Sequence, residues 1–219
     1  CIRDSDITGY LTCEEKNIRI KRTVTAMFRI ISHARKKVSL FPRITDVNQP
    51  QEYDVDKLLE IIRNGTYYHL KPKVEAVRSA GTKDEKNRKK ALLPVVTWNG
   101  TFRSRHKNEC TVYSSYTALD FDHIAPKDMP AFAGWLQGFS CVYAYFVTPG
   151  GTGYKAIIIH DNCEPLYHYD LYGQLLRLFN CPWIDNSTTD LARGNYLSYD
   201  PASVSYTHLR AHETLANLV

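Results

Sequence analysis

The chain has 219 residues, a net charge of +5 and a hydrophobic fraction of 43%. This length provides for one α/β domain, or for one domain with an extension. No apolar run approaches the ~18 residues of a membrane span, and no signal-peptide pattern opens the chain. The six cysteines form no C-x-x-C pair, which argues against a zinc ribbon. We therefore expect a cytoplasmic protein without a membrane partner.

Both ends of the chain depart from the pattern of a folded domain. The stretch after Ser203 reads VSYTHLRAHET and resembles the conceptual translation of a sequencing adapter. We leave 204–219 out of the fold argument as a non-native tail. Met27 is a possible start, so residues 1–36 are either an N-terminal extension or read-through. The predicted domain then covers 37–203.

The first half of this domain predicts a short strand over 37–42, followed by a helix. The helix shows apolar residues at helical spacing and ends at Asn64-Gly65; its apolar positions are Val55, Leu58, Leu59 and Ile62. A second helix is expected over 69–80, an exposed charged segment over 83–90, and a strand over 95–98 before the Asn99-Gly100 turn.

Positive charge is concentrated between Lys71 and Lys107. This stretch holds eleven basic and three acidic residues, a local net charge of +8. Such a stretch suits a phosphate backbone, although a solvated basic helix and loop explains it equally well. The residues we expect to contact nucleic acid are Lys89, Lys90, Arg103 and Arg105.

The second half predicts four strands and two helices. The strands are expected over 117–122, 141–147, 155–159 and 195–199. One helix follows Asp128, with Pro130 in its first turn, and the other covers about 166–179. The order β-α-β-β-α-β is that of the split βαβ, or ferredoxin-like, unit. The expected fold class is therefore α/β (α+β), with an N-terminal α/β extension.

In such a unit the first strand lies between the third and the fourth, both antiparallel to it. Polar residues from three segments should then meet at one edge of the sheet. Asp120 and Asp122 end the first strand, Lys155 opens the third, and Asp185 precedes the fourth. Three polar segments that converge on one edge favour a functional site.

The three carboxylates predict a divalent metal site. Asp120 and Asp122 alternate along a strand, so their side chains share a face, where they repel unless a cation lies between them. Ligand sets made only of oxygen favour Mg²⁺ or Mn²⁺ over zinc. Asp185 is the expected third ligand, and Asp190 is a nearby rival. Metals held this way can activate a 3′-hydroxyl and stabilise a leaving pyrophosphate.

The turn at 149–153 predicts nucleotide binding. Gly151 and Gly153 let the backbone approach a phosphate closely, although a plain hairpin turn has the same composition. Lys155 and Arg193 offer cations for a triphosphate, and surface charge is the simpler explanation of each.

Five blocks carry a family resemblance: KVSLFPRITD, LLPVVTWNGTFRSR, TALDFDHI, VTPGGTGYKAIII and DLARGNYLSYDP. Together they resemble the VirE N-terminal-type domain of bacterial mobile elements, which is similar to the archaeo-eukaryotic primase superfamily. The resemblance implies a primase-polymerase fold with its carboxylate pair at Asp120 and Asp122. Ile184-Asp185 fits the third superfamily motif, and Arg193 fits a basic residue that follows it. Gly153-Tyr154-Lys155 takes the place of the second motif, with lysine where the superfamily has histidine.

The sequence therefore predicts a metal-dependent nucleotidyltransferase that acts on a single-stranded DNA template with nucleoside triphosphates. A downstream helicase domain or partner is expected from the resemblance. Two alternatives stay open: a sheet that binds single-stranded nucleic acid without chemistry, and an inactive relative that keeps only nucleotide binding.

Overall fold

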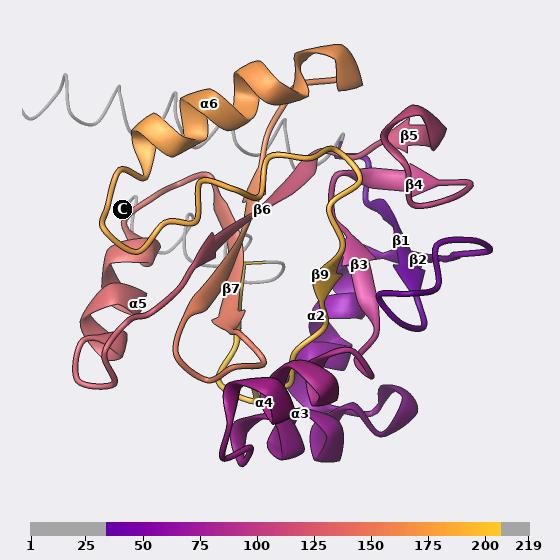
Figure 1. Ribbon diagram of the computed structural model, residues 1–219. Coiled ribbons are helices and arrows are strands. Elements are labelled where there is room, and N and C mark those ends of the chain that lie inside the picture. The colour runs from indigo at the N-terminus through magenta and orange to yellow at the C-terminus, as the bar shows by residue number, and fades with distance from the viewer. Residues whose placement is uncertain (1–33, 207–219) are drawn as a thin grey trace, which may run out of the picture. The chain divides into compact units, whose positions relative to one another are not determined.

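The computed structural model describes residues 34–206, so Met27, residues 1–33 of the expected extension and residues 207–219 of the expected tail lie outside the described residues. Its helices and strands (Figure 1) are β1 Lys37–Phe41, β2 Gln51–Asp54, α2 Val55–Asn64, α3 Leu70–Arg78, α4 Lys83–Lys90, β3 Val95–Thr97, β4 Gly100–Phe102, β5 Cys110–Tyr113, β6 Tyr116–Phe121, α5 Met129–Gln137, β7 Val142–Val147, β8 Tyr154–Ile159, α6 His168–Leu178, β9 Asn195–Tyr196 and β10 Val204–Ser205. Short 3₁₀ turns lie at Tyr67–His69, Lys107–Glu109 and Pro165–Tyr167.

The first sheet has the strand order β2-β1-β3-β9 and is antiparallel throughout. Helix α2 follows β2 directly and buries the four apolar residues that predicted it. The Asp54 side chain accepts a hydrogen bond from the Asp56 N–H at its start. Gly65 closes it in a left-handed conformation, with φ 67°, which a residue with a side chain adopts only at a cost. The predicted helix is thereby confirmed.

Two short helices follow, and the second of them is the charged segment. Helix α3 confirms the helix expected within 69–80, and residues 83–90 form α4. The Thr82 side chain caps α4 by accepting from the Glu85 N–H. No residue of α4 is buried, so packing contributes little to this helix. Its cap and its side-chain pairs stabilise it instead.

The second sheet has the strand order β10-β7-β8-β6, and its pairings are antiparallel. Helices α5 and α6 cover one of its faces (Figure 1). The core between them is rich in aromatic rings, among them Phe121, Phe132, Tyr154 and Phe179. Asp128 takes the N-cap position of α5, but its side chain makes no capping hydrogen bond. The sheet and both helices agree with the predicted β-α-β-β-α order up to α6.

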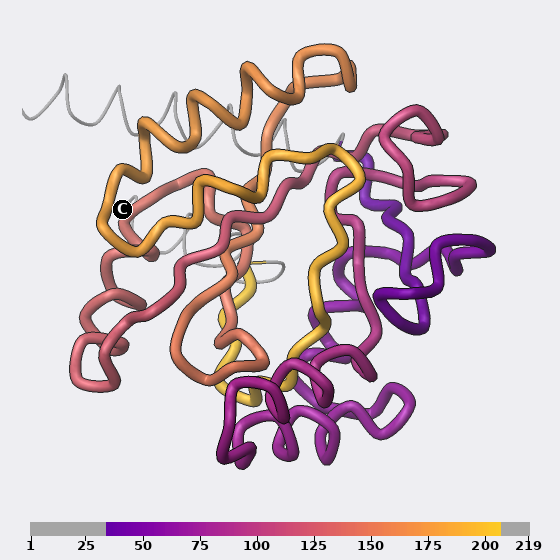
Figure 2. The backbone as a smooth tube through the Cα atoms, viewed as in Figure 1, coloured from indigo at the N-terminus to yellow at the C-terminus, as the bar shows by residue number. Residues whose placement is uncertain are grey.

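The fourth strand of the expected unit is placed differently. Residues 195–199 were expected to flank β6, but only Asn195 and Tyr196 form a strand, and they pair with β3 of the first sheet. The free edge of β6 is taken instead by Ile184, which forms a bridge to Phe121. Figure 2 shows the chain after α6 passing from the second sheet to the first. The ferredoxin-like prediction was therefore wrong for its last strand.

The excluded tail also contributes to the fold. Val204 and Ser205 form β10 and pair with Tyr145 and Ala144 of β7. Val204 packs against the core of the second sheet. The fold therefore extends past residue 203, because β7 has an open edge that these two residues cover. Within residues 34–206, no helix is both long and apolar enough to cross a membrane.

Candidate active site

The site begins with a cross-strand pair between β6 and β8. Asp120 lies directly opposite Lys155 in the antiparallel register. Side chains opposite each other in such a ladder are close enough to interact, and opposite charges stabilise the pair. The Lys155 ammonium donates to the Asp120 carboxylate and to Asn195 Oδ1, the latter at 2.7 Å. Lys155 is only 4% exposed, so its charge is held inside the protein by these two partners.

Asp122 follows β6 and stands close to this pair. Burial raises the pKa of its carboxyl, and the negative charge of Asp120 raises it further. The positive charges of Lys155 and Lys90 act in the opposite direction. A Cβ on Gly153 would lie 2.2 Å from the Phe121 carbonyl oxygen and 3.0 Å from Asp122 Oδ1. The missing side chain at Gly153 thus allows the loop to pack against the end of β6.

Asp185 reaches the same edge through its backbone. The Asp185 N–H donates to the Asp120 carbonyl at 2.9 Å, and the Asp122 N–H donates to the Trp183 carbonyl at 2.8 Å. Burial alone would raise the pKa of Asp185. The N–H and hydroxyl of Ser187, together with the charges of Arg193 and Lys155, hold that pKa below its usual range. We call Asp120, Asp122, Asp185 and Lys155 the carboxylate edge.

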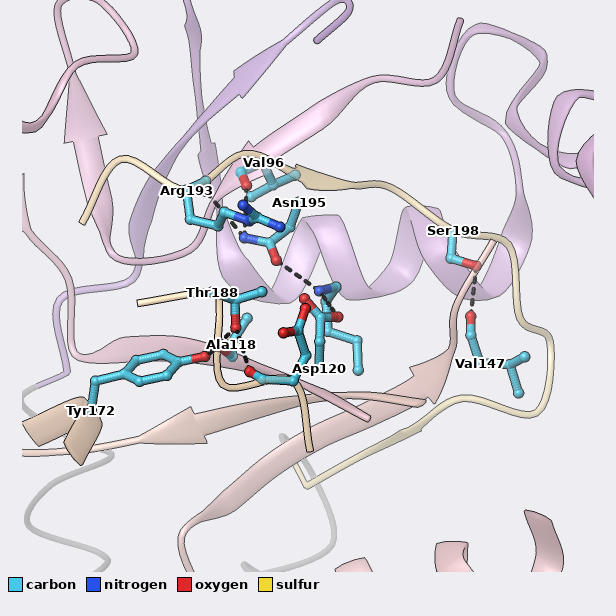
Figure 3. Close-up of polar contacts among 11 residues, drawn as sticks. Val96, Ala118, Asp120, Val147, Tyr172, Thr188, Arg193, Asn195 and Ser198 are labelled. Atoms are coloured by element: carbon cyan, nitrogen blue, oxygen red, sulfur yellow. Dashed lines mark hydrogen bonds and ion pairs between the residues drawn. The ribbon is translucent and has the colours of Figure 1, made fainter. Parts of the chain in front are cut away.

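Residues of the first sheet, of α6 and of the segment between them surround this edge (Figure 3). The Asn195 side-chain amide donates to the carbonyls of Val96 and Arg193, at 3.4 and 3.1 Å, while its oxygen accepts from Lys155. Tyr172 of α6 bonds to Thr188, and the Thr188 hydroxyl donates to the Asp185 carbonyl. The exposed Arg193 stands beside this network, and its charge acts on Asp185.

Asp190, the rival third carboxylate, has a different environment. Its side chain accepts from the Ala192 N–H at 3.0 Å and so closes a turn. Its charge acts on Arg105 and His168. Asp185 is the one whose backbone bonds to Asp120, and this favours it over Asp190 as a member of the site.

The carboxylates suit a hard cation in part. Asp120 and Asp122 offer oxygen atoms of the kind that Mg²⁺ and Mn²⁺ prefer, and their repulsion is what such an ion would relieve. Across residues 34–206, however, no group of three or more His, Cys, Asp or Glu side chains is arranged to hold a metal ion. The carboxylate pair therefore fits the expected ion, and a preformed ligand set of three does not appear in the described residues.

The glycine-rich turn packs against basic side chains of helices α3 and α4. Gly151 has φ +80°, a left-handed value that favours glycine, and a Cβ there would lie 3.5 Å from the Arg78 side chain. Lys86 Nζ donates to the Gly150 carbonyl at 3.1 Å. Residues 150–151 thus lie between helices α3 and α4 and the carboxylate edge.

The four residues expected to contact nucleic acid fall into different environments. Lys90 lies at the loop, within 4 Å of where a Cβ of Gly150 would be, whereas Lys89 is paired with Glu85 at 2.6 Å. Arg103 is exposed beyond β4. Arg105 is half-buried over the Phe41 ring and donates to the Ile44 carbonyl. The structure therefore does not gather these four into one surface.

Several residues of this region were missed in the sequence. Asn195 was read only as part of a strand, and Arg78 and Lys86 only as parts of a basic run. An amide at the start of a predicted strand is the only signal that the sequence offered for Asn195, since a polar group buried there needs a partner. No comparable signal marks Arg78 or Lys86, because their partners are backbone carbonyls far along the chain.

The fold and this edge define an α+β domain, whose described residues form two four-stranded antiparallel sheets and the β4-β5 hairpin, with a charged site where the chain passes from one four-stranded sheet to the other. The chain belongs to the family described as BT4734-like, N-terminal domain, which it matches over residues 87–204. That range contains every residue of the carboxylate edge. The match does not confirm the VirE N-terminal type expected from the sequence, which stays a prediction.

Among solved structures, the chain is similar to one described as "Crystal structure of primase RepB′", at 10% identity and a TM-score of 0.37. The alignment covers 84% of this chain and 56% of that one, so the chain spans little more than half of the solved protein. No curated protein matches the chain closely enough in sequence to count as a relative.

Proposed function

We propose that this domain is a primase-polymerase-like nucleotidyltransferase, which joins nucleotides on a single-stranded DNA template. The observation that carries the proposal is the pairing of Ile184 with Phe121, which puts Asp185 beside Asp120 and Asp122. The raised pKa of Asp122 shows that its carboxylate is unfavourable at this sheet edge, and such perturbed groups are typical of functional sites. The resemblance of the five sequence blocks to primase-like domains supports the same conclusion.

In this proposal Asp120 and Asp122 hold Mg²⁺ or Mn²⁺, and Asp185 completes the ligand set. The ion would polarise the reacting phosphate and stabilise the charge that develops on it. Arg193, exposed beside Asp185, would bind the incoming triphosphate through its planar fork of donors. Lys155 would hold Asp120 in place from inside the protein, because its ammonium is already committed to Asp120 and Asn195.

The test is a primer-synthesis assay with single-stranded DNA, labelled nucleotides and either metal. The Asp120→Ala/Asp122→Ala variant should form no product, and Asp185→Asn should reduce product at least a hundredfold. Asp190→Asn is the matched control, since it removes a nearby charge and keeps a side chain that can cap the same turn. Full activity in the double variant, or equal loss in both Asn variants, would contradict the assignment.

One observation favours a second function, a binding module without chemistry. Lys155 already neutralises Asp120, and no three-acid metal cluster appears within residues 34–206. A module of this kind should keep its affinity for single-stranded DNA in the Asp120→Ala/Asp122→Ala variant, or gain affinity as negative charge is lost. Unchanged DNA affinity together with no product from the parent protein would favour this function.

A further inference from the structure

A group of cations lies next to the carboxylate edge, at the glycine-rich turn. Arg78 donates to the Tyr199 carbonyl at 2.9 Å and to the Thr148 carbonyl at 3.4 Å. Lys86 donates to the Gly150 carbonyl, and Lys90 Nζ lies 3.6 Å from where a Cβ of Gly150 would be. We call Arg78, Lys86 and Lys90 the loop cations.

The loop cations have no carboxylate partner in an ion pair. Within residues 34–206 the ion pairs are Lys36–Asp56, Lys89–Glu85 and Lys155–Asp120. Glu85 is the acid nearest along α4, and it is taken by Lys89 and by the Gly81 N–H. The charges of Asp200 and Glu75 act on Arg78 without forming an ion pair with it. The positive charges of Lys86 and Lys90 are therefore the ones most available to a ligand, and carbonyl groups hold Arg78 and Lys86 in position.

The arrangement of these charges follows the helix. Lys86 and Lys90 are four residues apart on α4, so their side chains share one face of the helix, with about 6 Å between their Cβ atoms. Both reach the Pro149–Gly153 turn at Gly150, which is half-buried, whereas Pro149 and Gly153 are buried. The result is a row of two ammonium groups beside Gly150, which suits the phosphates of a nucleic-acid backbone.

This row is continuous with the carboxylate edge. The positive charge of Lys90 acts on Asp122, and Gly153 of the same turn packs against Asp122. A nucleic-acid strand that is bound to the loop cations would thus pass close to the carboxylates, because the turn itself contacts Asp122. Arg193 is a separate exposed cation whose charge acts on Asp185, and it is left for a second ligand.

We propose that the loop cations bind the backbone phosphates of a single-stranded nucleic acid and guide the strand to the carboxylate edge. This inference rests on the proposed function, and it assigns the strand to the side of α4 and the triphosphate to the side of Arg193. Lysine side chains act as point charges that position a backbone without reading its bases, so the contact is independent of sequence.

The experiment measures binding of a labelled oligothymidylate to the full chain over a range of salt concentrations, without metal. Lys86→Gln/Lys90→Gln should weaken binding about tenfold, and it should make the slope of log affinity against log salt shallower by about 1.4, or 0.7 for each lost phosphate contact. Arg88→Gln is the matched control for Lys90→Gln, because it removes one charge from the same helix at a position two residues from both Lys86 and Lys90, which does not share their face. The control variant should keep most of the parent protein's slope of log affinity against log salt.

Three outcomes would overturn the proposal: an unchanged slope, an equal change in the control, or a loss of nucleoside-triphosphate affinity with strand binding intact. Lys90→Gln alone, expected to change the slope by about 0.7, answers the question if the double variant unfolds. The same comparison in the Asp120→Ala/Asp122→Ala background separates this inference from the proposed function. Strand binding should depend on the loop cations there as well, whether or not the parent protein makes any product.

Discussion

At the scale of single residues, Asp122 is held in an unfavourable state. Its raised pKa means that ionising this carboxylate costs free energy in the folded protein, because the side chain is partly buried and lies near the charge of Asp120. Asp122→Asn keeps the shape and removes the charge. We expect the melting temperature to rise by about 1–3 °C, measured at pH 7 without metal. A lower melting temperature would show that the carboxylate stabilises the fold.

The same carboxylate should respond to metal. An ion that binds only the folded protein raises its melting temperature by mass action. We expect Mg²⁺ or Mn²⁺ to stabilise the parent protein and to leave Asp120→Ala/Asp122→Ala unchanged. Ca²⁺ is a useful comparison, since it is also a hard cation but prefers more ligands. Equal stabilisation of parent and variant would place the metal elsewhere.

Lys155 should contribute strongly to stability. Lys155→Met leaves the partly buried Asp120 beside Asp122 without its lysine partner, and breaking such a pair costs about 3 kcal/mol. Denaturant unfolding measures the loss. Lys155→Met combined with Asp120→Asn should recover much of it, because no uncompensated charge remains. If the combined variant is no more stable than the single one, packing of the lysine stem is the main contribution.

At the scale of elements, the close approach of the glycine-rich turn to β6 depends on Gly153. Gly153→Ala would put a Cβ against the Phe121 carbonyl and push β8 away from β6. We expect a loss of about 1–3 kcal/mol in the free energy of unfolding, measured with denaturant. Gly134→Ala is the control, since nothing lies within 4 Å of that position in α5, and alanine should stabilise the helix. Similar effects in both would contradict the close-approach argument.

The elements themselves were largely predictable from the sequence. Helical spacing of buried residues located α2, and a continuous apolar run located β7. The partner of β9 was not predictable, because a strand of two residues has no periodicity that says which edge it joins. The hairpin of β4 and β5 was missed for a similar reason: exposed residues in β5 weaken the apolar pattern.

The site was predictable in its acids and less so in its cations. Asp120, Asp122 and Asp185 stand out because each follows apolar residues, and the antiparallel register then places Lys155 opposite Asp120. What Lys155 does depends on Asn195, which comes from the other sheet, 40 residues later. Contacts of that range are set by the whole fold, so no local pattern reports them.

At the scale of the whole molecule, two buried histidines link stability to pH. The rings of His160 and His168 both lie against the Tyr113 ring, and burial lowers the pKa of each from 6.5 to about 4. Below pH 6.5 the unfolded chain therefore takes up protons that the folded chain refuses. We expect the free energy of unfolding to fall by about 1.4 kcal/mol per pH unit for each histidine, down to about pH 4.

Denaturant unfolding at a series of pH values checks this dependence. His160→Phe keeps a ring beside Tyr113. It should reduce the slope of the free energy of unfolding against pH by the contribution of one histidine. The change removes at most a weak contact with the Tyr116 backbone, because neither ring nitrogen of His160 makes a hydrogen bond of normal geometry. A variant with the slope of the parent protein would assign the acid sensitivity to other groups.

The passage of residues 183–200 between the sheets has a consequence for how the protein is made. Strands β1, β3, β6, β7 and β8 all leave the ribosome before Asn195 does. Until that residue emerges, the ammonium of Lys155 lacks one of its two partners, and β3 has an open edge. Each four-stranded sheet therefore lacks one edge strand until the last described residues have been added, because β9 completes the first sheet and β10 the second. A chaperone that covers exposed strand edges would be needed most during this last stage of synthesis.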